Sequence, residues 1–268
     1  MLTFVSVLIG GYMLMLGGLY VIQRHLLYFP DTSAPIQVSN DPLKLKDVTY
    51  TTADGLNLVS WYSAPAPGMP TVLYFHGNAG HIGSRGDKIR PFVAEGYGVL
   101  LAGYRGYGGN EGVPNEQGLF ADARAAVKFL QGQGTGAKSL VLYGESLGSA
   151  VATRMAVDLS QGGGVMALVL EAPFTSVVEA ASHFYPMFPV KWLLHDRYET
   201  SAIIGLIEAP VFIFHGDKDI TMPIRFGKKL YDIASHPKEK LWVAGAGHND
   251  LFDHGADSAV LDFIARQR

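Results

Sequence analysis

The sequence of 268 residues contains no cysteine, and this absence excludes several kinds of chemistry. Without a thiol, the chain cannot form disulfide bonds, use a cysteine nucleophile or bind a metal through thiolates. The formal net charge of −3 gives no indication of nucleic acid as a partner. Internal repeats, low-complexity tracts and a glycine-rich phosphate-binding loop are also missing. These absences leave chemistry that depends on side chains other than thiols.

Charge is absent from the first 23 residues as well. As a helix, residues 2–22 would span ~32 Å, about the thickness of a bilayer core. The glycine pairs at 10–11 and 17–18 would weaken a soluble helix but are tolerated in membrane spans. A cleaved signal peptide would have a basic start and a clear cleavage site, and a buried core helix is rarely this long. We predict that residues 1–23 form a transmembrane anchor, with the lipid bilayer as a partner.

Positive charge follows the predicted span and none precedes it. Arg24, Lys44 and Lys46 lie on the C-terminal side, so the positive-inside rule favours a cytoplasmic catalytic domain. Residues 24–45 contain three prolines and little hydrophobic periodicity, which predicts a connector between the anchor and the domain.

Residues 46–268 show the pattern of an α/β domain. Segments 48–52 and 56–62, separated by a turn, predict an antiparallel hairpin. Apolar strand segments then alternate with helical segments, which predicts a mostly parallel sheet with helices on both faces. The ligand site of such a sheet lies at the carboxyl ends of its strands. The expected strands are 71–75, 97–102, 139–143, 165–170, 211–214 and 240–243, and the expected helices include 84–95, 116–131, 224–234 and 257–268.

The most informative motif is Gly144-Glu-Ser146-Leu-Gly148. A Gly-x-Ser-x-Gly pattern between a strand and a helix is typical of a nucleophile elbow, in which a sharp turn exposes the serine hydroxyl. An apolar strand segment precedes the motif, and apolar residues at helical spacing follow it. Serine is a weak nucleophile without a base and an orienting acid, so an ordinary strand–helix turn is the alternative for the motif alone.

Suitable partners for Ser146 follow the last two predicted strands. Asp217 and Asp219 come after one of them, and His248 comes after the other. The chain order Ser, Asp, His is that of α/β-hydrolases and differs from the orders in the chymotrypsin and subtilisin folds. Because the carboxyl ends of parallel strands meet at one edge of the sheet, these side chains are expected to lie together.

We predict a triad in which Ser146 is the nucleophile and His248 is the general base. Asp219 is preferred to Asp217 as the acid, because Asp217 has the character of a turn residue in its loop. His248 follows small residues at a strand end, whereas His254 lies near the start of the closing helix. The aspartate would hold the imidazole tautomer and stabilise the imidazolium.

Acyl transfer also requires donors for the oxyanion of the tetrahedral intermediate. The backbone N–H of Leu147, the residue after the nucleophile, is one expected donor. The second is assigned to the N–H of Asn78 in the loop after strand 71–75, with Ala79 as the near alternative. His76 in the same loop is interpreted as a structural residue that packs or hydrogen-bonds beneath it.

These motifs together resemble the bud-emergence-like α/β-hydrolases, which are related to the membrane-associated α/β-hydrolase-domain-containing (ABHD) serine hydrolases. The resemblance implies the same triad of Ser146, Asp219 and His248, and an activity on esters, thioesters or acylglycerols. Gly103 departs from the pattern, since relatives usually carry Asp there. The matching pieces are Leu26-Leu-Tyr-Phe-Pro30, Phe75-His-Gly-Asn-Ala-Gly80, Tyr104-Arg-Gly-Tyr-Gly108, Gly144-Glu-Ser-Leu-Gly148, Ala172-Pro-Phe-Thr-Ser176, His215-Gly-Asp-Lys-Asp219 and Gly247-His248.

The interval 173–208 is rich in aromatic residues, and in an α/β-hydrolase an insertion here is a small cap over the site. Phe184, Tyr185, Phe188 and Trp192 are therefore expected to bind substrate in an apolar acyl pocket. Alternatively, these side chains dip towards the bilayer beside the anchor, or they only pack the cap onto the domain.

The sequence thus predicts a membrane-anchored serine hydrolase that cleaves a carboxylic ester of a lipid or another acylated molecule. We expect this reaction to require no metal or cofactor. One alternative is an acyl-protein thioesterase or a peptidase, since both use the same triad. The other is a non-catalytic membrane scaffold that kept the fold, because a fold alone does not define a function.

Overall fold

An eight-stranded sheet forms the centre of the protein in a computed structural model that describes residues 2–36, 43 and 45–268. The strand order is β10-β9-β8-β7-β4-β6-β3-β2, in which β2 and β3 form an antiparallel hairpin, β3 pairs antiparallel to β6, and the other pairs are parallel. The strands are β2 (Lys46–Thr51), β3 (Asn57–Ser63), β4 (Thr71–Phe75), β6 (Gly98–Ala102), β7 (Leu140–Glu145), β8 (Ala167–Glu171), β9 (Val211–Gly216) and β10 (Lys238–Val243). The predicted α/β fold class is confirmed.

Helices cover both faces of this sheet, because its central strands are apolar on both sides. Leu73 and Phe75 belong to the core on one face, while their neighbours Val72 and Tyr74 belong to the core on the other. The first core is closed by α3 (Glu116–Gly132), α4 (Leu147–Ser160) and α8 (Arg225–Ile233), and the second by α2 (Gly86–Ala94) and α9 (Ala256–Ala265).

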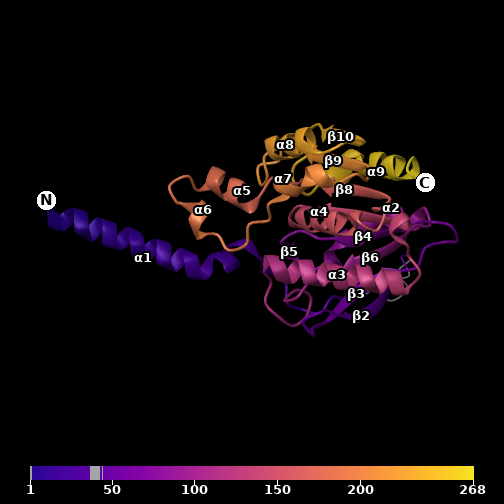
Figure 1. The fold of residues 1–268 in the computed structure, drawn as a ribbon, viewed down its shortest axis with the longest axis horizontal. Coiled ribbons are helices and arrows are strands. Elements are labelled where there is room, and N and C mark those ends of the chain that lie inside the picture. Colours follow the sequence, from indigo (N-terminus) through magenta and orange to yellow (C-terminus); the bar gives the residue numbers. More distant parts are fainter. Residues whose placement is uncertain (1, 37–42, 44) are drawn as a thin grey trace.

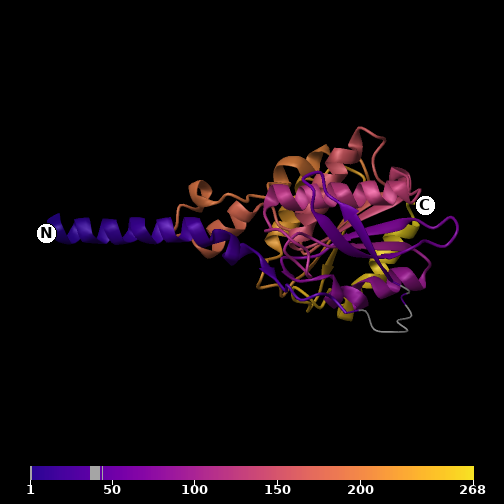
Figure 2. The same cartoon turned by 90° about the horizontal axis from the view of Figure 1, so that it is seen from below.

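A long apolar helix, α1 (Leu2–Leu27), projects from the domain (Figures 1 and 2). By length and composition, residues Thr3–Leu27 could cross a membrane, and a signal sequence would pass the same test. The helix continues beyond residue 23, where the anchor was expected to end. Arg24 and His25 lie in its last turn, where cations complement the helix dipole.

The segment expected as a connector, residues 24–45, includes the last turn of α1 and a short strand. After α1 ends, β1 (Phe29–Pro30) pairs in parallel with β5 (Ala79–Gly80) in the loop that follows β4. The end of α1 is thereby attached directly to the edge of the sheet where a ligand site is expected. Residues 37–42 and 44 of the expected connector lie outside the described residues.

The segment between β8 and β9 forms three short helices, α5 (Val177–Phe184), α6 (Val190–Leu193) and α7 (Thr200–Ile203). In both ribbon views α5 and α6 lie beside the C-terminal part of α1 (Figures 1 and 2). Within the interval 173–208, where a small cap was predicted, we refer to residues 177–198 as the cap. A position of its side chains beside the anchor was one of the alternatives left open by the sequence.

Candidate active site

Ser146 lies in a strained turn between β7 and α4. Its backbone dihedral angles are φ 50° and ψ −114°, a conformation that a side chain disfavours and that is kept where surrounding contacts enforce it. The flanking glycines are required by close packing. A Cβ on Gly144 would overlap the carbonyl oxygen of Gly148, and one on Gly148 would overlap that of Phe75. The strand, turn and helix expected around the serine are therefore present.

The structure brings Ser146, His248 and Asp219 together. The Nε2 atom of His248 lies 3.0 Å from Ser146 Oγ, and its Nδ1 atom lies 2.6 Å from Asp219 Oδ2. The alternative residues are engaged elsewhere: Asp217 Oδ1 accepts a hydrogen bond from the N–H of Gly245, and His254 lies 3.6 Å from Asp250. The geometry is that of a serine, a base and an orienting acid in line.

The carboxylate of Asp219 is held by three donors. The Met222 N–H donates to Oδ1 at 2.7 Å, and Oδ2 is 3.0 Å from His215 Nε2 in addition to its contact with His248. Burial opposes ionisation of this group, but the hydrogen bonds from His215 and His248 outweigh it and hold the pKa of Asp219 well below its usual range. The acid is therefore an anion at ordinary pH, as the orientation of an imidazole requires.

His215 was not identified as a site residue from the sequence. Its side chain is fully buried, and Nε2 lies 2.6 Å from the carbonyl oxygen of Met222 as well as near Asp219. This pattern places the proton on Nε2, because a carbonyl can only accept. The signal was present in the sequence, since His215 opens the same strand-end motif that contains Asp219.

Asn78 and Leu147 border the same cavity as Ser146. The loop of Asn78 is fixed by hydrogen bonds that its carbonyl oxygen accepts from Phe29 N and Tyr107 Oη, at 2.9 and 2.8 Å. Leu147 is the first residue of α4, so its N–H has no acceptor within the helix. Ala79, the alternative oxyanion donor, belongs to β5 and is not among the residues that border the cavity.

His76 lies beneath this loop and not at the reactive atoms. It is buried, its Nδ1 contacts the carbonyl oxygen of Gly77 at 2.8 Å, and its ring packs on Tyr104. Burial, assisted by the nearby Arg85, lowers the pKa of His76 to about 3. The imidazole is therefore neutral at ordinary pH, which agrees with the structural role expected for it.

A buried ion pair between Arg85 and Glu145 lies beside the turn that carries Ser146. Glu145, which precedes the nucleophile, accepts hydrogen bonds from Arg85 at 2.8 Å and from Tyr74 at 2.7 Å. Burial opposes its ionisation, but Arg85 more than compensates and lowers the pKa of Glu145.

Within the described residues, no cluster of three or more His, Asp or Glu side chains is arranged to hold a metal ion.

A cavity of about 670 Å³ opens from Ser146 between the domain, the cap and α1. Three of the four side chains expected to bind substrate line it, namely Phe184, Tyr185 and Phe188. Trp192 does not border it, and its side chain is 83% exposed on the outside of the cap. The contribution of α1 was not predicted from the sequence. This helix supplies Leu19, Gln23, Leu26 and Leu27 to the wall.

Comparison with known proteins agrees with this architecture. The family described as serine aminopeptidase, S33, matches residues 69–203. An uncharacterized protein of Mycobacterium tuberculosis is 41% identical over 250 residues, which cover 91% of this chain and 86% of that protein. The lysophosphatidylserine lipase ABHD12 of Danio rerio is 34% identical over 221 residues, which cover 69% of this chain and 57% of that protein.

Solved structures share the fold. The Pyrococcus furiosus esterase Pf2001 superposes with a TM-score of 0.69 at 22% identity, covering 89% of this chain and 98% of that one. The acetyl xylan esterase from Paenibacillus sp. R4 superposes with a TM-score of 0.68 at 20% identity, covering 85% and 86% of the two chains. The strand order, the elbow between β7 and α4 and the family match lead to one assignment: the chain belongs to the serine aminopeptidase S33 family of α/β-hydrolases.

Proposed function

We propose that the protein is a membrane-anchored serine hydrolase that cleaves carboxylic esters of lipids or other acylated molecules. The observation that carries this proposal is the position of Ser146 Oγ, 3.0 Å from His248 Nε2 and at the wall of an apolar cavity. A cavity of about 670 Å³ is in the range that holds one small ligand. The similarity to a lysophosphatidylserine lipase also favours an acyl-ester substrate.

In the acylation step, Ser146 Oγ attacks the ester carbonyl while His248 Nε2 takes the hydroxyl proton. Asp219 stabilises the imidazolium that forms. The N–H groups of Leu147 and Asn78 donate to the developing oxyanion, and each such donor typically lowers the barrier by ~3 kcal/mol. Collapse of the tetrahedral intermediate breaks the bond to the alcohol oxygen, which receives the proton from His248. The acyl group remains on Ser146.

In the deacylation step, water attacks the acyl-enzyme and His248 accepts its proton. The second tetrahedral intermediate collapses, the carboxylic acid leaves, and Ser146 recovers its proton from the imidazolium. No group beyond the triad and the two N–H donors is needed for this cycle, so we propose that the reaction is independent of metal and cofactor.

An aminopeptidase activity is less well supported than ester hydrolysis. A free peptide amino terminus is a cation, and a buried cation requires a carboxylate or a similar partner. Among the described residues, no Asp or Glu side chain borders the cavity. A thioester substrate has no cationic group that needs a carboxylate partner. Acyl-protein thioesterase activity is therefore the second reaction to test.

We further propose that α1 anchors the protein in the membrane, with residues 46–268 as the catalytic domain on the cytoplasmic side. The support is the apolar span Thr3–Leu27 and the positive charge at its C-terminal end and beyond, at Arg24, Lys44 and Lys46. A protease-protection assay on sealed vesicles, with a tag at the C-terminus, tests the orientation. Protection of the tag in inside-out vesicles would contradict the proposal.

The reaction is tested by labelling the purified full chain with a fluorophosphonate, which reacts with activated serines. We expect labelling of the wild-type protein and none of Ser146→Ala, because only Ser146 has His248 in reach. Hydrolysis of p-nitrophenyl esters, monoacylglycerols, thioesters and peptides then defines the substrate class. A folded wild-type protein that resists the label would contradict the proposal, and preference for acetyl over longer esters would contradict a lipid substrate.

A further inference from the structure

One face of α1 contacts the cap from Tyr12 to the end of the helix. Tyr12 Oη donates a hydrogen bond to the carbonyl oxygen of Met187 at 2.9 Å. About three turns further on, the side chain of Gln23 donates to Leu193 O at 3.0 Å and accepts from His195 N at 2.7 Å. The spacing of these contacts places them on a single stripe of the helix. The cap and residues 12–27 of α1 therefore form one unit, which we call the helix–cap unit.

The helix–cap unit reaches far along the apolar span. The first charged side chain of α1 is Arg24. Tyr12 lies 12 residues before Arg24, or about 18 Å along the helix axis. A bilayer core is about 30 Å thick, so a crossing helix with Arg24 in the headgroup region places Met187 and its neighbours in the hydrocarbon.

The side chains of the cap are distributed as this position requires. We call the end of the cap that contacts Tyr12 the tip. Phe184, Tyr185 and Met187, near the tip, are exposed and apolar or aromatic. Charges gather instead at the level where α1 ends: Arg24 pairs with Asp196 at 3.0 Å, and the adjacent Arg197 donates to the carbonyl oxygen of Lys191 at 2.9 Å.

Polar atoms near the tip are also partly satisfied. The hydroxyl of Tyr12 donates a hydrogen bond to the carbonyl oxygen of Met187. Such pairing is required in hydrocarbon, because no water is present there to satisfy polar groups. Trp192, 83% exposed and next to Lys191 in the chain, has the side chain typical of a membrane–water interface. The helix–cap unit therefore has an apolar tip and a charged base.

The cavity runs along α1 inside this unit. Near Ser146, its wall includes Leu27, whose carbonyl oxygen accepts a hydrogen bond from the Asn78 side chain at 2.9 Å. Towards the tip it includes Leu19, which is eight residues or about 12 Å further along the helix. An acyl chain esterified at the carbonyl that Ser146 attacks would extend along α1 in the direction of the tip.

We propose that the helix–cap unit is seated within a single leaflet, and that α1 is a wall of the acyl site which receives the chain of its substrate directly from the hydrocarbon. The anchor is then part of the substrate-binding machinery as well as a tether. This inference rests on the proposed function for the reaction at Ser146, but the position of the unit in the bilayer can be measured without any reaction.

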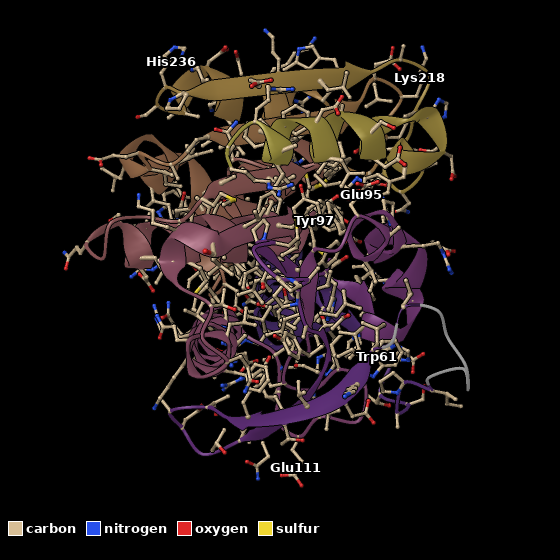
Figure 3. The ribbon with its side chains drawn as sticks, turned by 90° about the vertical axis from the view of Figure 1, so that its right-hand side faces the viewer. Trp61, Glu95, Tyr97, Glu111, Lys218 and His236 are labelled. Atoms are coloured by element: carbon tan, nitrogen blue, oxygen red, sulfur yellow. The ribbon has the colours of Figure 1, made fainter. Side chains whose placement is uncertain are left out.

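The position is tested with a single introduced cysteine, because the chain has none of its own. Met187→Cys in the full chain is labelled with a nitroxide in phosphatidylcholine nanodiscs, and Glu95→Cys is the matched control. Met187 is 63% exposed and does not border the cavity, whereas Glu95 lies at the end of the molecule away from α1 (Figure 3). We expect the label at 187 to collide with oxygen and to be shielded from a water-soluble nickel chelate, and the label at 95 to show the reverse. Equal access of nickel to both positions would overturn the proposal.

The wall is tested by two substitutions on the same helix. Leu19→Trp would fill the far part of the cavity, while Leu14→Trp changes a residue that is 80% exposed and outside it. We expect Leu19→Trp to lower the ratio of kcat/KM for p-nitrophenyl laurate over p-nitrophenyl butyrate by about tenfold. This is the lower end of the discrimination that one methylene group gives in a hydrophobic pocket. Leu14→Trp should keep the wild-type ratio.

Identical laurate-to-butyrate ratios of kcat/KM in both variants and the wild-type protein would show that α1 is not part of the acyl site. Absence of hydrolysis of every ester by the wild-type protein would instead contradict the proposed function. The nitroxide measurement would still decide whether the helix–cap unit lies in the leaflet.

Discussion

Asp219 and His248 are joined by a hydrogen bond of 2.6 Å between Oδ2 and Nδ1. The contact connects the loop after β9 with the loop after β10, two neighbouring parallel strands. It leaves Nε2 directed at Ser146 Oγ, and it therefore determines the tautomer in which His248 is able to act as a base.

Asp219→Asn should lower kcat by about 10⁴-fold, because an amide favours the wrong tautomer of His248 while it preserves the shape of the side chain. Asp217→Asn is the matched control, two residues away in the same loop. Its Oδ1 accepts from Gly245 N, a bond that an amide oxygen can keep. Steady-state kinetics on a soluble ester measure both variants. A larger loss in Asp217→Asn would mean that the acid has been assigned to the wrong residue.

His215→Phe should reduce kcat by about 10- to 100-fold, the effect of removing one hydrogen bond to a charged group. The same loss raises the pKa of Asp219, since His215 is one of the groups that lower it. His215→Gln, which retains a donor, should recover part of the rate, and steady-state kinetics on a soluble ester measure both variants. An unchanged kcat in His215→Phe would indicate that His215 only fills space.

His76→Asn should flatten the acid dependence of stability. The folded protein binds a proton at His76 with a pKa of about 3, whereas the unfolded chain binds it near 6.5. Between these values the unfolded state holds more protons, so the free energy of unfolding falls as the pH falls, by up to about 1.4 kcal/mol per pH unit. Urea unfolding in detergent at several pH values between 6 and 4 compares the two proteins. Parallel curves would show that His76 does not carry this dependence.

Gly103→Ala should destabilise the fold by about 1–3 kcal/mol, the usual effect of overpacking. A Cβ at Gly103 would overlap the carbonyl oxygen of Val59 and lie 2.7 Å from Asn110 Nδ2. The Asn110 amide bonds to both backbone groups of Val59, at 2.7 and 3.1 Å, and this close approach leaves no room for a side chain at position 103.

Gly132→Ala is the control for that substitution. Gly132 ends α3 and nothing lies within 4 Å of an added Cβ, so this change should be neutral or stabilise by less than about 1 kcal/mol. Thermal unfolding of the two variants in the same detergent provides the comparison. Equal melting temperatures would show that the contact with Val59 tolerates a side chain.

Several elements could be predicted closely from the sequence because their signals are local. Strand β4 begins and ends where it was expected, at Thr71–Phe75, since a continuous apolar run bounded by Pro and Gly has few other solutions. The elbow at Ser146 was equally predictable, because only glycine fits where strand and helix pass this closely. The short pairing of β1 with β5 was not, since two residues on each strand form no recognisable pattern.

The sequence by itself determined the order of strands and helices, the turn that strains Ser146 and the apolar character of the first 23 residues, since each depends on side chains close together in the chain. Only the tertiary structure decided that Trp192 faces outward and that α1 borders the cavity. Those outcomes depend on contacts such as that of Tyr12 with Met187, 175 residues apart. No local pattern encodes a contact of this kind, because it is formed only when separate elements pack in three dimensions.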